Sequence, residues 1–207
     1  MTEYQSLDDL KKHESEHKDW KQSFEARDSW LVIVAPHGRT IEPITELIAK
    51  ETAADLYSWF IFEGLRKKIP ERKWLHVPSE HFEDPDLKKL QAKASVTLSV
   101  HGAADREAHP ARVTYVGGNN TILRDLIWSE LEGSGFDVVL GTGNLAGLHK
   151  DNFVNRTPGH GVQLEISKSE RVQLVDNPIR RARYIESLHA ALETYQKTFF
   201  QNTPCTT

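Results

Sequence analysis

The feature that most constrains the fold is a series of short apolar runs separated by longer amphipathic segments. Runs of this length between helix-like patterns predict buried strands in an α/β domain, where helices pack against a sheet. The runs occupy residues 30–35 (WLVIVA), 57–62 (YSWFIF), 95–100 (SVTLSV), 112–116 and 136–140.

A further strand candidate, residues 161–167 (GVQLEIS), alternates between apolar and polar side chains. Successive side chains of a strand point to opposite faces of the sheet, so the two kinds are expected to separate. The expected faces are Val162, Leu164 and Ile166 on one side, and Gln163, Glu165 and Ser167 on the other.

Helix signals lie between the apolar runs. Glu42-Pro43 is expected to begin a helix that continues over residues 44–54, because proline is favoured at the first helical position. The C-terminal helix is expected to carry a core-facing stripe of apolar side chains at 3–4-residue spacing. The other expected helices cover residues 87–94, residues 120–132 before a pair of glycines, and the segment from Asn177-Pro178 onward.

The length of 207 residues fits a single domain, with the core at about residues 28–200 and the first 25 or so residues peripheral. The net charge of −4 provides no global basic field for nucleic acid or a membrane surface. No stretch approaches the roughly 20 apolar residues of a membrane-spanning helix. We therefore expect neither kind of partner, and we favour a monomer.

The number of cysteines and the character of the first twenty residues indicate the cellular compartment. Cys205 is the only cysteine, which excludes an intrachain disulfide and a cysteine-rich zinc site. The first twenty residues contain no apolar core of signal-peptide length. The expected location is a reducing cytoplasm, from which a phage-encoded protein could be released on cell lysis.

Two of the ten histidines stand out by their placement. His37 and His101 each follow an apolar run and each precede a glycine. Ligands of open α/β sheets bind beyond the carboxyl ends of strands, so these side chains are expected to converge. Each could instead cap its strand through a loop hydrogen bond. His76 is interpreted as a core or edge residue. The histidines interpreted as surface residues are His13, His17, His81, His109, His149 and His189.

Two glutamates add chemistry to this pair. Glu42 lies five residues after His37 and completes a two-histidine, one-carboxylate set, the ligand type of catalytic zinc. Its alternative role is a negative charge at a helix N-terminus. Glu165 either faces solvent or points into the site, where a carboxylate can accept a proton from metal-activated water.

Five ordered segments between about residues 30 and 167 stand out as motifs: PHGRTIEP (36–43), FEGLRK (62–67), LSVHG (98–102), YVGG (115–118) and DNFVNRTPGHGVQLEIS (151–167). Together they resemble the phage-derived poly-γ-glutamate hydrolase family, relatives of the zinc carboxypeptidases. They appear in that family's order.

The resemblance implies a carboxypeptidase-like α/β fold around a mixed, mostly parallel sheet flanked by helices, with one Zn²⁺ per chain. It implies His37, Glu42 and His101 as metal ligands and Glu165 as general base. The implied activity is cleavage of the γ-amide bonds of poly-γ-glutamate, the capsule polymer that bacteriophages are expected to strip from their hosts.

Poly-γ-glutamate carries a free α-carboxylate on every residue, and arginine can bind carboxylates through two hydrogen bonds. Arg156 is the first candidate, because the resembling carboxypeptidases place an Asn-Arg pair like Asn155-Arg156 in their carboxylate site. Arg39 and Arg66 are the next candidates. Each arginine could instead be solvated surface.

Other functions fit the same residues. A metallo-amidase or carboxypeptidase acting on other peptide or cell-wall substrates would share all four catalytic residues. A non-catalytic protein could keep the fold and bind polyanions through its arginines, but it would need no base beside a metal. Nucleic-acid binding is disfavoured because the sequence shows no basic stripe interleaved with aromatics.

Overall fold

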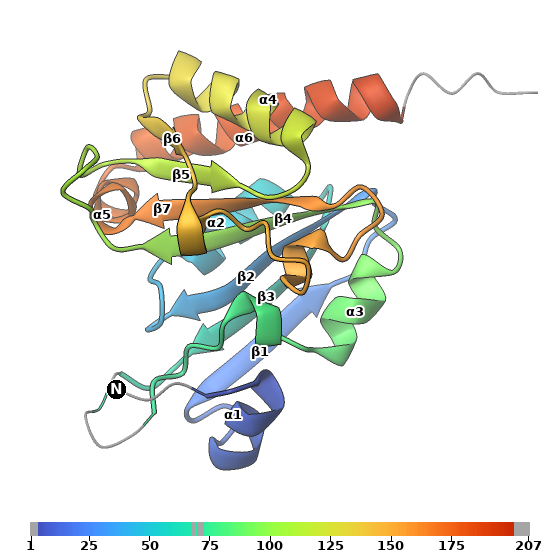
Figure 1. Ribbon diagram of the computed structural model, residues 1–207, viewed down its shortest axis with the longest axis vertical. Coiled ribbons are helices and arrows are strands. Elements are labelled where there is room, and N and C mark those ends of the chain that lie inside the picture. Colours follow the sequence, from blue (N-terminus) through green and yellow to red (C-terminus); the bar gives the residue numbers. More distant parts are fainter. Residues whose placement is uncertain (1–3, 68, 70–72, 201–207) are drawn as a thin grey trace, which may run out of the picture.

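The computed structural model describes residues 4–67, 69 and 73–200, which form a seven-stranded sheet flanked by helices (Figure 1). The strands follow the order β1-β3-β2-β4-β7-β5-β6 across the sheet. Their bounds are β1 Trp20–Glu25, β2 Leu31–Arg39, β3 Ser58–Gly64, β4 Val96–Ala103, β5 Thr114–Gly117, β6 Val138–Leu140 and β7 Gly161–Ser167.

The sheet is mixed and mostly parallel, which confirms the predicted fold class. β2 pairs in parallel with β3 and β4, β4 pairs in parallel with β7, and β5 pairs in parallel with β6. The antiparallel pairs are β1 with β3 and β5 with β7. The carboxyl ends of β2, β4 and β7 therefore meet at one end of the sheet.

Every α-helix except α2 begins at a residue whose side chain caps the first turn. Asp84, Asn120 and Asn177 each accept a hydrogen bond from a backbone N–H in the first turn of a helix. Within the described ranges, no helix is long and apolar enough to cross a membrane. The α-helices are α1 Leu7–His13, α2 Thr45–Ala53, α3 Pro85–Gln91, α4 Thr121–Gly133, α5 Lys168–Asp176 and α6 Pro178–Phe199, with short 3₁₀ turns η1 Ser79–His81, η2 Gly143–Leu145 and η3 Phe153–Asn155.

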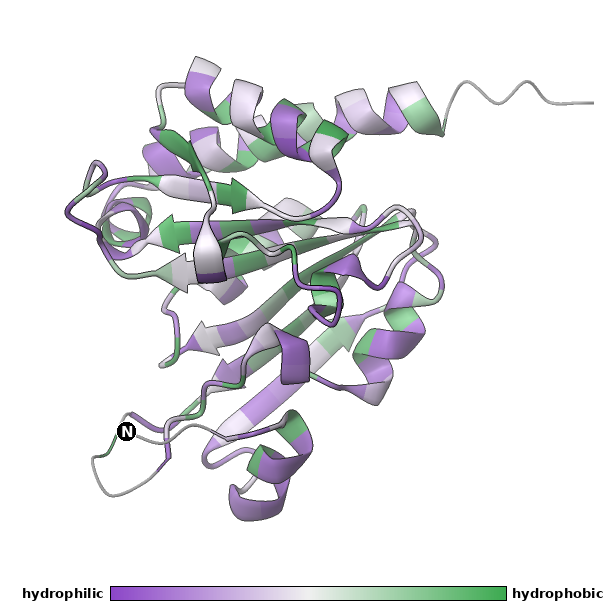
Figure 2. Cartoon of the chain, in the orientation of Figure 1, coloured by the Kyte–Doolittle hydropathy of each residue, from purple (hydrophilic) through white to green (hydrophobic). Residues whose placement is uncertain are grey.

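Both faces of the sheet are covered. β2 and β3 are mainly apolar on both sides, whereas β4 and β7 are apolar on one side and carry buried polar side chains such as Ser99 and Gln163 on the other. One face packs against α2, α4 and α6 through a cluster that includes Leu98 and Leu164. The opposite face packs against α1, α3 and η3 through a second cluster that includes Val34 and Phe62. The helices carry both hydrophilic and hydrophobic residues (Figure 2), as expected for elements between core and solvent.

The sequence patterns do not predict α1, β1 or α5. β1 is an edge strand, and after Trp20 its residues are half-buried or exposed. Leu7 and Leu10 of α1 and Trp20 of β1 nevertheless belong to the second core cluster. The segment expected to be peripheral thus forms one edge of the sheet and part of its core.

Candidate active site

His37 reaches the site because β2 carries an extra residue. The pairing of β2 with β3 shifts between Ala35 and Gly38, which is a β-bulge that includes Pro36 and His37. Strand alternation alone would place His37 on the same face as Ala35, towards α2. The bulge turns the ring to the opposite face, where its centroid lies 6.3 Å from that of Phe82.

His101 and Glu165 lie beside each other on neighbouring strands. They are register partners in the parallel pair of β4 with β7, so both side chains leave the same face of the sheet. The His101 ring stacks on Phe153 of that face, with 6.2 Å between centroids. Both β2 and β4 run past their predicted ends, so the two histidines lie within the strands rather than in the following loops.

Glu42 lies in a strained turn between β2 and α2. Its backbone N–H donates to the carbonyl oxygen of His37 at 2.7 Å. Arg39 and Ile44, on either side, adopt positive φ values of 57° and 74°, conformations that cost such residues about 1–3 kcal/mol each. The left-handed Ile44 makes α2 begin at Thr45, two residues after the predicted start.

The Glu42 carboxylate lies between the two histidines. Its Oε1 is 3.2 Å from His37 Nδ1, and its Oε2 is 3.8 Å from His101 Nδ1. Oε2 also accepts a hydrogen bond from the backbone N–H of Gly102 at 2.8 Å. All three residues are more than nine-tenths buried, so the space between their donor atoms is largely free of solvent.

The contacts of His37 fit a cation at this point. His37 Nε2 lies 2.8 Å from the carbonyl oxygen of Val77, and because a carbonyl only accepts, Nε2 carries the hydrogen. In a neutral ring the lone pair is then on Nδ1 and faces the Glu42 carboxylate, an arrangement that a cation stabilises. His101 Nε2 is buried and has no hydrogen-bond partner among the described residues. Histidine nitrogens and a carboxylate are the donor types found in catalytic zinc sites, which keep one position open for water.

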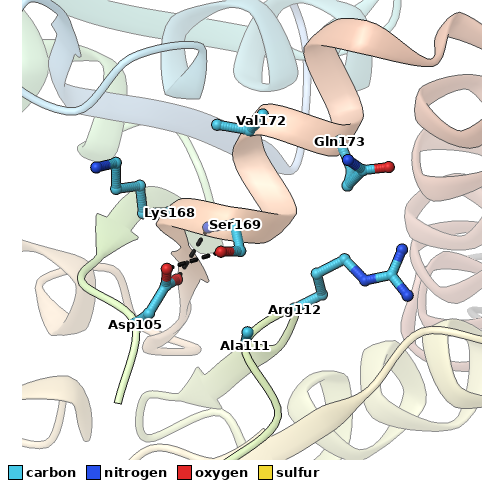
Figure 3. Close-up of a pocket in the computed structure, with 7 residues that line it drawn as sticks. All are labelled: Asp105, Ala111, Arg112, Lys168, Ser169, Val172 and Gln173. Atoms are coloured by element: carbon cyan, nitrogen blue, oxygen red, sulfur yellow. Dashed lines mark hydrogen bonds between the residues drawn. The ribbon is translucent and has the colours of Figure 1, made fainter. Parts of the chain in front are cut away.

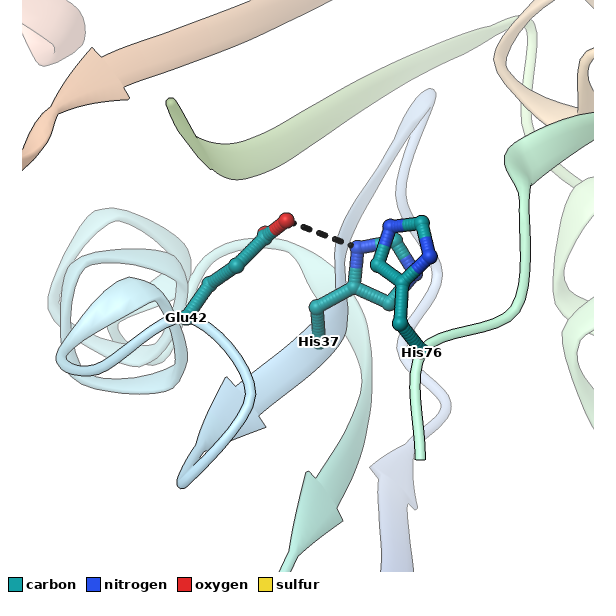
Figure 4. Close-up of side chains that lie close together, drawn as sticks. All are labelled: His37, Glu42 and His76. Atoms are coloured by element: carbon teal, nitrogen blue, oxygen red, sulfur yellow. Dashed lines mark ion pairs between the residues drawn. The ribbon is translucent and has the colours of Figure 1, made fainter. Parts of the chain in front are cut away.

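A third histidine, His76, belongs to the same cluster. One donor atom from each of His37, Glu42 and His76 lies within 4.8 Å of the others, and these three form a candidate metal-binding group (Figure 4). In this group His76 stands in the place that the sequence predicted for His101. Burial, reinforced by His37, lowers the pKa of His76 to about 3, so the ring is neutral at neutral pH. The sequence gives no spacing signal for His76, because it comes from a separate segment 39 residues after His37.

The two carboxyl groups have opposite electrostatic environments. Burial raises the pKa of Glu165 well above the usual 4.5, and the charge of Glu42 raises it further. A hydrogen bond of 2.9 Å from Gln163 Nε2 to Glu165 Oε1 opposes this shift. Burial also disfavours charge on Glu42, but the neighbouring histidines, His37 first, lower its pKa to about 2. One carboxyl group therefore stays charged while the other can exchange a proton.

Arg171 joins the backbones of the three segments that carry the site. Its Nε donates to the carbonyl of Ile166 at 3.1 Å, and its terminal nitrogens donate to the carbonyls of Pro43 at 3.2 Å and Ala103 at 3.3 Å. Each of these carbonyls lies just after a site residue: Pro43 follows Glu42, Ile166 follows Glu165, and Ala103 comes two residues after His101. Gly102 leaves room for the guanidinium, because a Cβ there would lie 2.6 Å from its central carbon.

A cavity of about 490 Å³ opens over these side chains. The residues expected to bind metal or act as base all line it, together with His76. Asn152 also lines it and donates to Gln163 Oε1 at 2.9 Å, which extends the hydrogen-bond chain from Glu165. Across the described part of the chain, Arg106 is the only arginine or lysine that lines this cavity.

The predicted carboxylate-binding pair Asn155-Arg156 does not line this cavity. Arg156 forms an ion pair with Glu83 and donates to the carbonyl of Phe82 at 3.2 Å. Asn155 is buried and donates to the carbonyl of Gly147 at 2.7 Å. Both side chains are thus engaged in holding loops of the protein together.

Arg39 and Arg66 also lie outside the cavity. The Arg66 side chain is buried, with a terminal nitrogen 2.7 Å from a carboxylate oxygen of Glu14 and Nε 3.5 Å from one of Asp19. Arg39 is half exposed, and its Nε lies 3.8 Å from a carboxylate oxygen of Glu63. The structure therefore brings together the predicted metal and base residues, but none of the four predicted substrate-binding residues.

Comparison with known proteins identifies the family of the chain. Residues 4–198 match the family of poly-gamma-glutamate hydrolases. The SPbeta prophage-derived protein YoqZ of Bacillus subtilis (strain 168) is 37% identical over 150 residues, which cover 71% of this chain and 52% of YoqZ. The chain thus spans about half the length of that relative.

Two solved structures share the fold over nearly the whole chain. A bacteriophage poly-gamma-glutamate hydrolase superposes with a TM-score of 0.85 and 27% identity, covering 96% of this chain and all of that one. A zinc-free apo structure of YndL superposes with a TM-score of 0.83 and 26% identity, covering 94% of this chain and 99% of that one. The chain belongs to the poly-gamma-glutamate hydrolase family.

Proposed function

We propose that this protein is a zinc-dependent hydrolase that cleaves the γ-glutamyl amide bonds of poly-γ-glutamate. In this proposal His37, Glu42 and His101 hold the metal and Glu165 is the general base. The observation that carries the proposal is a buried carboxyl group of raised pKa, Glu165, in the same cavity as a cluster of metal-type donors. Family membership supports the substrate class.

A zinc ion held by these donors supplies Lewis-acid activation of a water and of the scissile carbonyl. Glu165 accepts a proton from the attacking water and then donates it to the nitrogen of the leaving amine. Because Gln163 holds Oε1 of Glu165 through its hydrogen bond, Oε2 is the oxygen that exchanges the proton. The raised pKa suits both steps, since a protonated carboxyl group is stable in this buried place.

Neighbouring groups support the role assigned to each residue. Glu42 keeps its charge, because His37 and His101 hold its pKa at about 2, so it serves as a ligand and not as the base. The hydrogen bond from His37 Nε2 to the Val77 carbonyl fixes the orientation of that ring, as supporting contacts commonly do for metal ligands. Arg171 holds the three backbone segments in register.

The test is to follow the chain length and viscosity of poly-γ-glutamate with the purified protein, with and without a chelator. Rapid shortening that stops with the chelator and returns with added zinc is expected. An α-linked polyglutamate offered in parallel separates the alternative, a peptidase or amidase of other specificity. Cleavage of the α-linked chain alone, or unchanged cleavage after complete metal removal, would contradict the proposal.

A further inference from the structure

The candidate catalytic cavity is rich in carboxyl groups. Glu42, Glu80 and Glu165 line it, while the proposed polymer brings another carboxylate with every residue. A negatively charged chain entering such a cavity needs a positive group to offset this repulsion. In the ranges that the structure describes, Arg106 is the only arginine or lysine on the cavity wall.

The Arg106 side chain is positioned but not neutralised. A terminal nitrogen donates to Asn144 Oδ1, a neutral acceptor, at 3.1 Å, and Arg106 makes no ion pair with a described residue. Its guanidinium carbon lies 5.7 Å from the centre of the Tyr115 ring, and Tyr115 is the register partner of Glu165. A guanidinium has five N–H donors, so several are left for a ligand. Arg156, by contrast, is already paired with Glu83.

The preceding residue fixes the loop that carries Arg106. Asp105 turns away from the cavity, and its two carboxylate oxygens accept hydrogen bonds from the backbone N–H and the hydroxyl of Ser169, at 2.9 and 2.7 Å (Figure 3). These bonds tie the loop after β4 to the first turn of α5. Arg106 is therefore presented to the cavity from an anchored loop, which reduces the entropy cost of binding.

We infer that Arg106 binds an α-carboxylate of the glutamyl chain beside the scissile γ-amide and thereby selects anionic substrates. This inference rests on the proposed function and specifies how its substrate is recognised. Arginine can bind a carboxylate through two parallel N–H···O bonds, which a lysine cannot reproduce. Arg106 is thus a specificity residue, whereas Glu165 performs the proton transfer.

The experiment compares two γ-linked glutamate oligomers, one with free α-carboxylates and one with every α-carboxylate converted to a carboxamide. Arg106→Ala is expected to raise KM for the free oligomer about 10–100-fold, the value of charge-assisted hydrogen bonds, with kcat changed by less than about threefold. The wild type and Arg106→Ala should cleave the amidated oligomer equally well. Arg106→Lys should recover part of the loss. The control is Arg112→Ala. Arg112 lies on the same loop but lines a different cavity, so its loss should leave KM and kcat unchanged for both oligomers.

Two outcomes would overturn the inference while leaving the proposed function intact. If Arg106→Ala lost the same amount of activity on both oligomers, Arg106 would act on the chemical step. If it lost no activity on either, another group would bind the carboxylate. A wild-type protein that cleaves neither oligomer would instead overturn the proposed function, and the inference with it.

Discussion

His101 and Glu165 are register partners on the parallel strands β4 and β7, so a proposed metal ligand and the proposed base stand next to each other on one face of the sheet. Glu42 joins them from a different segment through the hydrogen bond that its carboxylate accepts from the N–H of Gly102. Metal binding and proton transfer are thus assigned to adjacent side chains. Substitutions at the two positions should have separable effects.

Replacing His101 by alanine should remove the metal. The side chain contributes a buried nitrogen to the donor cluster, and the substitution leaves two of the three proposed ligands. Zinc affinity should fall by more than about 100-fold, beyond the roughly 10–100-fold cost of losing a supporting contact. Metal analysis after dialysis measures this, with the exposed His81→Ala as control. A variant that retains one tightly bound zinc would exclude His101 from the ligand set.

Replacing Gln163 by methionine should shift the pH dependence of kcat/KM. Glu165 acts as a base only when deprotonated, so activity rises as the pH passes its raised pKa. The hydrogen bond from Gln163 favours the charged carboxylate, and its loss should raise this pKa further. The acid limb of the profile should therefore move to higher pH. A limb that stays in place, or moves as far in the control Gln173→Met outside the cavity, would contradict this role.

Replacing Arg171 by methionine should destabilise the fold and disorder the site together. Three backbone carbonyls lose their donor, and leaving buried acceptors unsatisfied should lower the free energy of unfolding by about 2–4 kcal/mol. Urea denaturation at unchanged m-value measures this. The exposed Arg183→Met should change stability by no more than about 0.5 kcal/mol. Equal stability of the two variants would refute the assignment of Arg171 as the residue that joins the three segments.

Much of the sheet could be predicted because burial leaves a readable pattern. β7 shows this most clearly: Val162, Leu164 and Ile166 enter one core cluster, as its alternation predicts. Glu165 consequently lies on the other face, beside His101. The edge strand β1 was not predicted, because a half-exposed strand has no continuous apolar run. For a similar reason helix α5 was not predicted, since its Val172 and Val175 are exposed.

The geometry of the site depends on features that local sequence does not encode. The bulge at Pro36-His37 reverses the face of a histidine that alternation would place on the other side. His76 and Arg106 reach the cavity from loops whose course depends on tertiary contacts. The motif around Arg156 predicts a substrate-binding arginine, but the side chain forms an ion pair with Glu83 and does not line the cavity.

In the proposed mechanism Glu165 transfers the proton and does not hold the metal. The most direct measurement is zinc content and poly-γ-glutamate shortening in Glu165→Gln, which keeps the size of the side chain. The variant is expected to hold one zinc per chain, as the wild type does, and to shorten the polymer about 10²–10⁴-fold more slowly. Shortening at the wild-type rate, or loss of zinc from the variant, would contradict it.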